Sequence, residues 1–192
     1  MVLLLGFLQP QQAGAGQDAQ GPSLTVLVFN YADVSRATLE RAERQVDGTF
    51  YKGGFRLICL HCYPVIATAG ESCQRRIEPS DLQLRIFSAG GKDGAQDSVF
   101  GFAVAPALAT VYYEPARRLR KADSAEFETA VILGGVMAHE IGHLLLGAGG
   151  HSTTGIMQPH WYRRQIHSLM MGTLLFTADE FKVMRAGVER RQ

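Results

Sequence analysis

The sequence predicts an α+β protein with a mixed, mostly parallel twisted sheet, a long buried helix and a C-terminal helix. The chain has 192 residues and a mass of 21.0 kDa, which favours one compact domain. Its residues are 46% hydrophobic and 19% charged, so the chain can bury a real core. Strand-like runs fill most of the first half, and helical patterns fill the second half. Together these features are typical of an α+β fold.

The first strand and the first helix begin the predicted order. Residues 23–29 read SLTVLVF, a β-branched and apolar run that is typical of a buried strand. Ser35 can cap the amphipathic helix that we expect over residues 37–50, which Gly53 and Gly54 end. One face of this helix is apolar and consists of Leu39, Ala42, Val46 and Phe50.

Four more strands are expected before the helical half. Residues 55–62 form a second apolar run, and residues 81–87 alternate polar and apolar side chains as a half-exposed strand does. A polar, glycine-containing loop over residues 90–97 precedes two further strands, residues 100–105 and 109–113. The order of strand, helix and four strands indicates a mixed sheet.

A long core helix is expected next. Asp123 and Glu126 have the spacing of a capping box, and the chain is apolar from Ala130 to Gly150. A helix that is apolar on all sides lies in a core, where polar groups without partners cost several kcal/mol. The ionisable side chains in this stretch therefore need compensation; they are His139, Glu140 and His143.

The last predicted element is a C-terminal helix. It begins at Thr177, which has capping-box spacing to Glu180. The helix then carries the apolar residues Phe181, Met184 and Val188.

The charge balance excludes one class of function. Nineteen Lys and Arg residues oppose 18 Asp and Glu residues, which gives a formal net charge of +1. A protein held on nucleic acid by phosphate contacts needs a basic surface, and the sequence has no Lys/Arg-rich tract. We therefore expect no nucleic-acid partner. As a separate expectation, the protein is a monomer.

The N-terminus predicts export. Residues 1–8 (MVLLLGFL) are apolar, but they are far fewer than the roughly 20 residues that span a bilayer, so we expect no membrane span. They are similar to the apolar region of a secretory signal peptide, although no Lys or Arg precedes them. A disordered tail and a start codon placed too late are the alternatives. We expect a signal peptide over residues 1–16, a linker over residues 17–22, a single domain over residues 23–192, and a secreted or periplasmic location.

Three cysteines lie close together in the sequence. In an exported protein, the best interpretation is a disulfide between Cys62 and Cys73, with Cys59 as a lone buried thiol in a strand. The C-x-x-C spacing of Cys59 and Cys62 also fits a redox pair or half of a zinc knuckle. A knuckle has only His61 and Cys73 to complete it, so that alternative is weaker, and the pairing stays open.

One motif carries the strongest chemical signal. Residues 139–143 read H-E-x-x-H. On a helix, positions i and i+4 lie on one face about 6 Å apart, so the imidazoles of His139 and His143 can reach one metal ion. Neutral imidazole is a good zinc ligand. Glu140 can flank the metal, accept a hydrogen bond from a water molecule and take its proton.

The third ligand of such a site must come from elsewhere in the chain, with a fourth position open to water. We choose His151, because three glycines within residues 147–150 let the chain leave the helix and turn back. His160 and His167 are the alternatives. The acidic residues after the motif all belong to the final helix, where carboxylates suit the first turn.

The segment HEIGHLLLGAGGH followed by GIMQP resembles the metzincin zinc peptidases. Their signature is H-E-x-x-H-x-x-G-x-x-H followed by a methionine turn. The resemblance implies that His151 is the third zinc ligand and that Met157 is the turn methionine, in a sequence similar to the S-I-M-x-P turn of the matrixin branch. Core packing is the alternative role for Met157. This chain has one extra residue on each side of Gly147.

The resemblance implies a zincin-like catalytic domain over residues 23–192, with a long active-site helix. We expect a secreted zinc-dependent endopeptidase that hydrolyses peptide bonds by metal-activated water, with Glu140 as the general base. The cofactor is then Zn²⁺, and the partner is a peptide or protein substrate. The alternatives are a zinc hydrolase acting on non-peptide amides and a catalytically silent metal-binding domain of the same fold.

Substrate contacts are expected on two sides of this site. In matrixin-like domains a strand on the upper rim of the cleft pairs with extended substrate, and residues 100–105 stand in the matching order. Trp161, Tyr162 and residues 169–175 are candidates for the wall of a specificity pocket. Ordinary core packing is the alternative role for most of these side chains.

Overall fold

The computed structural model describes residues 21–62, 73, 76–89, 99–119, 125–147 and 150–191. Four sequence predictions lie outside these ranges. They are the signal peptide over residues 1–16, most of the linker over residues 17–22, the polar loop over residues 90–97, and the cap at Asp123.

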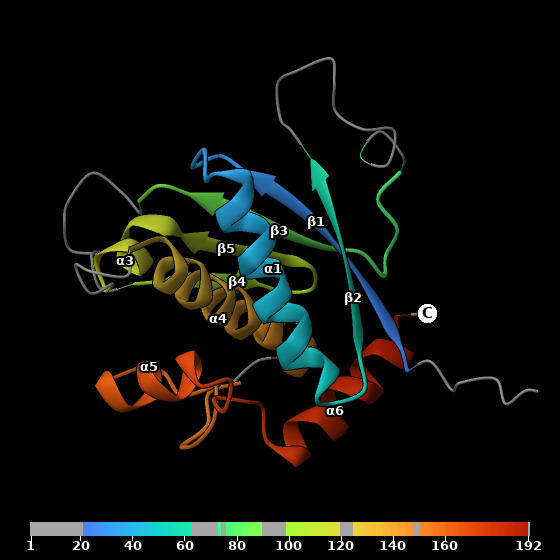
Figure 1. Ribbon diagram of the computed structural model, residues 1–192. Helices are drawn as coiled ribbons and strands as arrows, with labels where there is room; N and C mark the ends of the chain where they lie inside the picture. Colours follow the sequence, from blue (N-terminus) through green and yellow to red (C-terminus); the bar gives the residue numbers. More distant parts are fainter. Residues whose placement is uncertain are drawn as a thin grey trace, which may run out of the picture.

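A five-stranded sheet forms one layer of the protein (Figure 1). The strands lie in the order β2-β1-β3-β5-β4, and every neighbouring pair is parallel except β4 and β5. The predicted fold class, a mixed and mostly parallel sheet in an α+β protein, is therefore confirmed. The strands are β1 (Ser23–Asn30), β2 (Arg56–Cys62), β3 (Leu82–Phe87), β4 (Gly101–Val104) and β5 (Leu108–Tyr112).

Two long helices cover one face of the sheet, and the core lies between them and the strands (Figure 1). Helix α1 (Arg36–Tyr51) begins at the predicted cap, since the Ser35 side chain accepts a hydrogen bond from the Thr38 backbone N–H. Its predicted apolar face is buried, as Leu39, Ala42, Val46 and Phe50 are each at most 4% exposed. Alternate residues of β3 are buried, as the sequence pattern predicts.

Helix α4 (Ala125–Leu146) is the long core helix. It packs against α1 and against β3, β4 and β5. Within the described part of the chain, its segment Glu128–Leu146 is long and apolar enough to cross a membrane, but 83% of that segment is buried inside the protein. The buried helix of a globular core shows the same composition.

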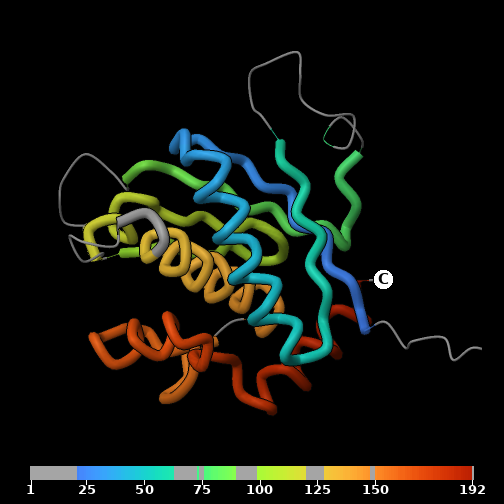
Figure 2. Tube along the Cα trace, viewed as in Figure 1, coloured from blue at the N-terminus to red at the C-terminus, as the bar shows by residue number. Residues whose placement is uncertain are grey.

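The C-terminal part of the chain, orange to red in Figure 2, lies along α4 on the side away from β3 and β5. Helix α6 (Ala178–Glu189) begins at Thr177 with the predicted capping box to Glu180. Two short helices were not expected from the sequence: α3 (Tyr113–Arg118), which follows β5 directly, and α5 (Arg163–Met170).

The cysteines are paired as the preferred interpretation has it. Cys62 and Cys73 form a disulfide, and Cys59 is free. Cys59 is a free thiol as expected, and it is partly buried against the core on β2, an outer strand of the sheet. Burial still dominates its chemistry, together with the nearby negative charges of Glu43 and Asp47, and raises the pKa of the Cys59 thiol to about 12.

Candidate metal centre

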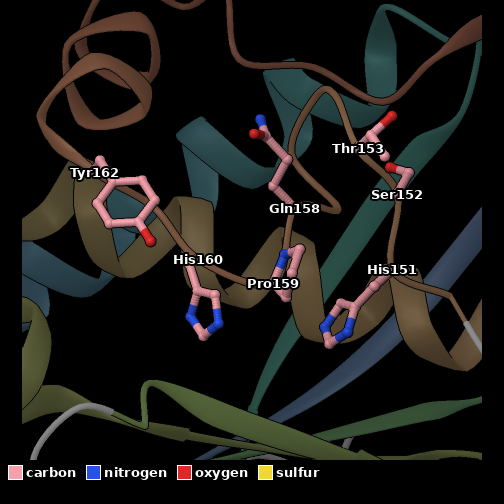
Figure 3. Close-up of a pocket in the computed structure, with 7 residues that line it drawn as sticks. All are labelled: His151, Ser152, Thr153, Gln158, Pro159, His160 and Tyr162. Atoms are coloured by element: carbon pink, nitrogen blue, oxygen red, sulfur yellow. The ribbon is translucent and has the colours of Figure 1, made fainter.

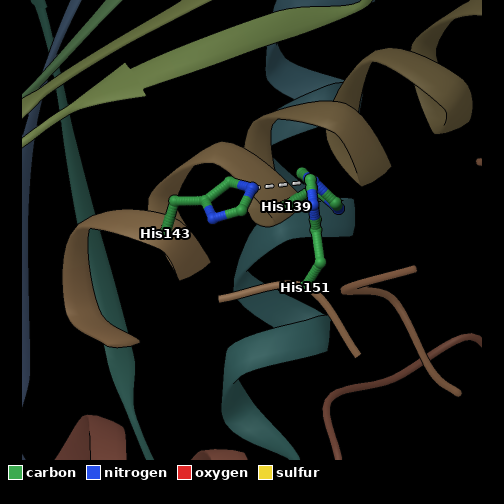
Figure 4. A group of neighbouring side chains, drawn as sticks. All are labelled: His139, His143 and His151. Carbon is green, nitrogen blue, oxygen red and sulfur yellow. Dashed lines mark hydrogen bonds between the residues drawn. The ribbon is translucent and has the colours of Figure 1, made fainter. Parts of the chain in front are cut away.

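Three histidines converge at the C-terminal half of α4 (Figure 4). His139 and His143 lie one turn apart on the helix, and His151 reaches them from the following loop. One ring nitrogen from each imidazole lies within 4.8 Å of the other two. His139 Nε2 and His143 Nε2 are 3.1 Å apart. The structure thus brings together the three side chains that the sequence predicts as ligands, in a group that could hold a metal ion.

The return of the chain from α4 depends on a glycine. Gly147 has a φ of +82°, in the left-handed region that favours glycine, and its N–H donates to the carbonyl of His143. The helix therefore ends at Leu146, and the ring of His151 lies beside that of His143, with 4.7 Å between the ring centroids. The extra residue on each side of Gly147 is accommodated without displacing His151 from the other two imidazoles.

The ring of His139 is held by the loop on the far side of the cluster. Its Nδ1 lies 2.8 Å from the carbonyl oxygen of Ile156, which can only accept, so Nδ1 carries the proton and Nε2 has a free lone pair. The Trp161 Nε1–H donates to the same carbonyl at 3.2 Å. A buried carbonyl thus fixes both the tautomer and the orientation of His139.

Burial keeps the two helix imidazoles uncharged. It holds the pKa of His139 below its ordinary value, against the raising effect of the Ile156 carbonyl. It also lowers the pKa of His143 to about 4, with repulsion from His139 and His151 as the smaller causes. At neutral pH, therefore, both rings are neutral and can offer lone pairs to a cation.

Glu140 is buried beside the imidazoles. The residue is 4% exposed, and its Oε2 atom has no hydrogen-bond partner among the described residues. Burial raises the pKa of this carboxyl to about 8. A Cβ atom added at Gly101 of β4 would lie 2.8 Å from Glu140 Oε1, so the glycine makes room for the carboxylate. A buried oxygen without a partner is costly, and a bound cation nearby would offset that cost.

These groups line a cleft of about 950 Å³. The lining includes residues 99–103, on β4 and just before it, and residues 158–162 of the loop after His151. Pro115, Arg118 and Leu119, from α3 and the residue after it, also contribute, although the sequence did not predict that helix. Trp161 and Tyr162, two of the candidates for the wall of a specificity pocket, both lie in this lining.

A second hollow of about 500 Å³ adjoins the cleft and shares five of its seven lining residues, His151 among them (Figure 3). His160 lines both hollows, but it is not part of the imidazole cluster. His167 lies exposed on α5. Of the three predicted candidates for the third ligand, His151 is thus the one that the structure places with His139 and His143.

Met157 packs against α4 at Gly142, within the H-E-x-x-H motif. It is fully buried, and its Sδ atom would be 2.7 Å from a Cβ atom added at Gly142, so the thioether packs against the helix backbone between Glu140 and His143. Met157 also belongs to the core cluster, as the alternative role requires. Its assignment as a matrixin-like turn methionine stays a prediction.

Besides α3, sequence reasoning missed three features that surround His139 and Glu140. They are the Ile156 carbonyl, the Trp161 N–H and the absence of a side chain at Gly101 of β4. A backbone carbonyl has no residue-type signal. The glycine within the run VFGFAV was the one available hint, because glycine in a strand often marks a close approach.

The fold has a counterpart among solved structures. The sequence matches no protein-family model and no curated protein sequence. By structure, the chain is similar to archaemetzincin from Methanopyrus kandleri, with a TM-score of 0.53 and 16% sequence identity. The match covers 88% of this chain and 97% of archaemetzincin. At this identity the similarity establishes a shared fold, with a mixed sheet and helices in the same arrangement.

Proposed function

We propose that this protein is a secreted zinc-dependent endopeptidase. The observation that carries the proposal is the convergence of three imidazoles with an unpartnered, buried carboxylate oxygen in one open cleft. The archaemetzincin fold agrees with the resemblance of the motif to metzincins. The Cys62–Cys73 disulfide supports export, because disulfides persist in oxidising compartments.

The donor set fits zinc. Two neutral, half-buried imidazoles and a third, exposed one supply nitrogen ligands, which suit this ion, and no cysteine lies in the cluster. His139, His143 and His151 would hold the metal and leave the cleft side for water and substrate. When bound there, zinc supplies a Lewis acid that makes water more acidic and polarises a carbonyl group.

Glu140 then acts as the general base and proton carrier. Its side chain is buried but lines the same cleft as His139, and burial raises its pKa to about 8. With a divalent cation held by His139, His143 and His151, this pKa would be lower, so the Glu140 carboxylate would be ionised and able to take a proton. After the attack, the same carboxyl can deliver the proton to the leaving amine.

Strand β4 orients the substrate. It is the last strand in the order and pairs with β5 on one side, so a peptide can add along its other edge. Phe100 and Ala103 of this region line the cleft, so the added peptide would run past the imidazoles and Glu140. This arrangement favours a peptide over a small non-peptide amide.

The proposal is tested by zinc analysis and a quenched-peptide assay with and without chelator. We expect bound zinc and chelator-sensitive cleavage, and we expect Glu140→Gln to abolish cleavage while zinc stays bound. The control is Glu40→Gln, the same change at an exposed carboxylate on α1 that pairs with Arg36. Cleavage unaffected by Glu140→Gln would reject the base. Zinc binding without peptide cleavage would favour the amide hydrolase or the silent domain.

A further inference from the structure

His151 needs support that the other two imidazoles do not. His139 and His143 are fixed by a buried helix, whereas His151 is exposed and lies beyond a glycine-containing turn. Its ring makes no hydrogen bond within the described part of the chain. Each loop residue that must be ordered costs about 1–2 kcal/mol of backbone entropy. A loop that is already ordered before the metal arrives would bind the metal more tightly.

The next residue supplies a connection to the C-terminal helix. Ser152 Oγ lies 2.7 Å from Glu180 Oε1, a contact between residues 28 positions apart. Figure 3 shows His151 and Ser152 next to each other on the loop, and both residues line the smaller hollow. The Ser152 hydroxyl is also 2.8 Å from the carbonyl of Thr154, but its single hydrogen goes to one acceptor at a time. The charged carboxylate is the stronger acceptor.

Glu180 is a rigid anchor. Its Oε2 accepts the Thr177 backbone N–H at 2.6 Å, and its own N–H donates to Thr177 Oγ1. The carboxylate is therefore locked into the first turn of α6, where the positive end of the helix dipole favours it. Helix α6 packs against α4 through Met184 and Val188, both at most 2% exposed. The anchor is thus fixed relative to the helix that carries the motif.

The same loop reaches His139. The Ser152 N–H donates to the Met157 carbonyl at 3.0 Å, which closes the turn over residues 152–157. The Ile156 carbonyl in this turn holds His139 Nδ1, and the Ile156 N–H donates to the Leu175 carbonyl just before α6. One short segment therefore sets the separation between the first and third imidazoles, and the Ser152–Glu180 hydrogen bond ties it to α6.

We propose that Ser152 and Glu180 are positioning residues for His151, which hold the third imidazole in place and thereby raise the affinity of the site for zinc. The inference rests on the proposed zinc function. In this interpretation Glu180 serves both as the capping residue of α6 and as the support of the metal loop.

The test measures zinc affinity by competition with a chelator on the full chain. Groups behind a metal ligand typically change affinity by 10–100-fold, so we expect Ser152→Ala and Glu180→Gln each to weaken zinc binding by about 10-fold or more. Glutamine has a single acceptor oxygen. If that oxygen keeps the Thr177 N–H, the start of α6 is retained, and the amide nitrogen then faces Ser152, so the hydroxyl loses its charged acceptor. The double variant should be little weaker than either single variant, because both remove the same contact.

Two further variants separate positioning from general stability. Ser152→Thr keeps the hydroxyl and should restore most of the affinity. Asp179→Asn changes the neighbouring carboxylate, which is exposed and pairs with Lys182, and should leave the affinity unchanged. The melting temperature of the metal-free protein should be the same for Ser152→Ala and the wild type within about 2 °C.

The outcomes are distinguishable. Zinc affinity in Ser152→Ala and Glu180→Gln equal to that of Asp179→Asn would overturn the positioning role and leave the proposed function intact. A loss in Ser152→Ala alone would overturn the part assigned to Glu180 and make Thr154 the acceptor. A wild-type protein that binds no zinc would overturn the proposed function itself.

Discussion

Gly101 on β4 offers a sharp test of the position assigned to Glu140. A Cβ atom at this residue would lie 2.5 Å from the Thr110 carbonyl oxygen and 2.8 Å from Glu140 Oε1. Restoring an ordinary contact of about 3.5 Å requires shifts of roughly 1.0 Å and 0.7 Å, respectively. Gly101→Ala therefore moves the carboxylate, the strand, or both.

The expected effect is larger on catalysis than on folding. A misplacement of about 1 Å near a reacting group can cost on the order of 100-fold in rate. Overpacking of a core position typically costs about 1–3 kcal/mol of stability. We predict that kcat/KM of Gly101→Ala for a quenched peptide falls by roughly 10–100-fold while the protein stays folded and binds zinc, since the three atoms nearest to the added Cβ belong to Thr110 and Glu140.

The control is the same substitution at Gly48, which is exposed on α1 and has no neighbour within 4 Å of an added Cβ atom. Alanine is the better helix former by about 0.8–1.0 kcal/mol, so Gly48→Ala should raise the melting temperature by roughly 2–4 °C and leave kcat/KM unchanged. Wild-type kcat/KM in Gly101→Ala would refute the placement of the Glu140 carboxylate in the reaction.

Three further predictions concern the metal, the free thiol and the core. Zinc at about 100 times its dissociation constant should stabilise the protein by about 2.7 kcal/mol. The melting temperature should rise, the rise should be reversed by a chelator, and His139→Ala should abolish it. An unchanged melting temperature would argue against a zinc site. Burial raises the pKa of Cys59 to about 12, so the thiol stays protonated at pH 8. Iodoacetamide should therefore label the native protein at least about 100-fold more slowly than the urea-unfolded protein. Equal labelling rates would contradict the burial of this thiol. Phe50→Ala should cost about 3–5 kcal/mol in urea unfolding, since this ring is fully buried against Phe55 and Phe176, and a cost below 1 kcal/mol would contradict the packing.

Elements with strong local signals could be predicted from the sequence. The strand over residues 23–29 is a continuous apolar run, and the helices that begin after Ser35 and Thr177 carry side-chain caps that the structure contains. Such features depend on neighbours within a few residues, so the sequence alone displays them.

The two unpredicted helices depend on tertiary contacts. Helix α3 contains Pro115 and follows a β-branched run directly, so its first residues looked like the end of a strand. Helix α5 has Tyr162 at its N-cap position and a narrow apolar face, in which Leu169 is the buried residue. Neither segment is long enough to show helical periodicity clearly.

The candidate site also has a part that local sequence predicts and a part that depends on tertiary structure. The pairing of His139 with His143 follows from helix geometry and needs no tertiary information. The preference for His151 over His160 and His167 rested on the nearby glycines and on the resemblance. Which histidine joins the other two depends on how a loop folds, and the structure places His151 in the cluster. The contact between Ser152 and Glu180 joins residues 28 positions apart, and no local pattern reports it.

X-ray absorption at the zinc edge, on the wild type and on His151→Ala, tests the central claim most directly. The wild type should show three imidazole nitrogens at about 2.0–2.1 Å and one further oxygen, and His151→Ala should lose one nitrogen. A sphere of four protein ligands, or one that is the same in both proteins, would contradict an open three-histidine zinc site.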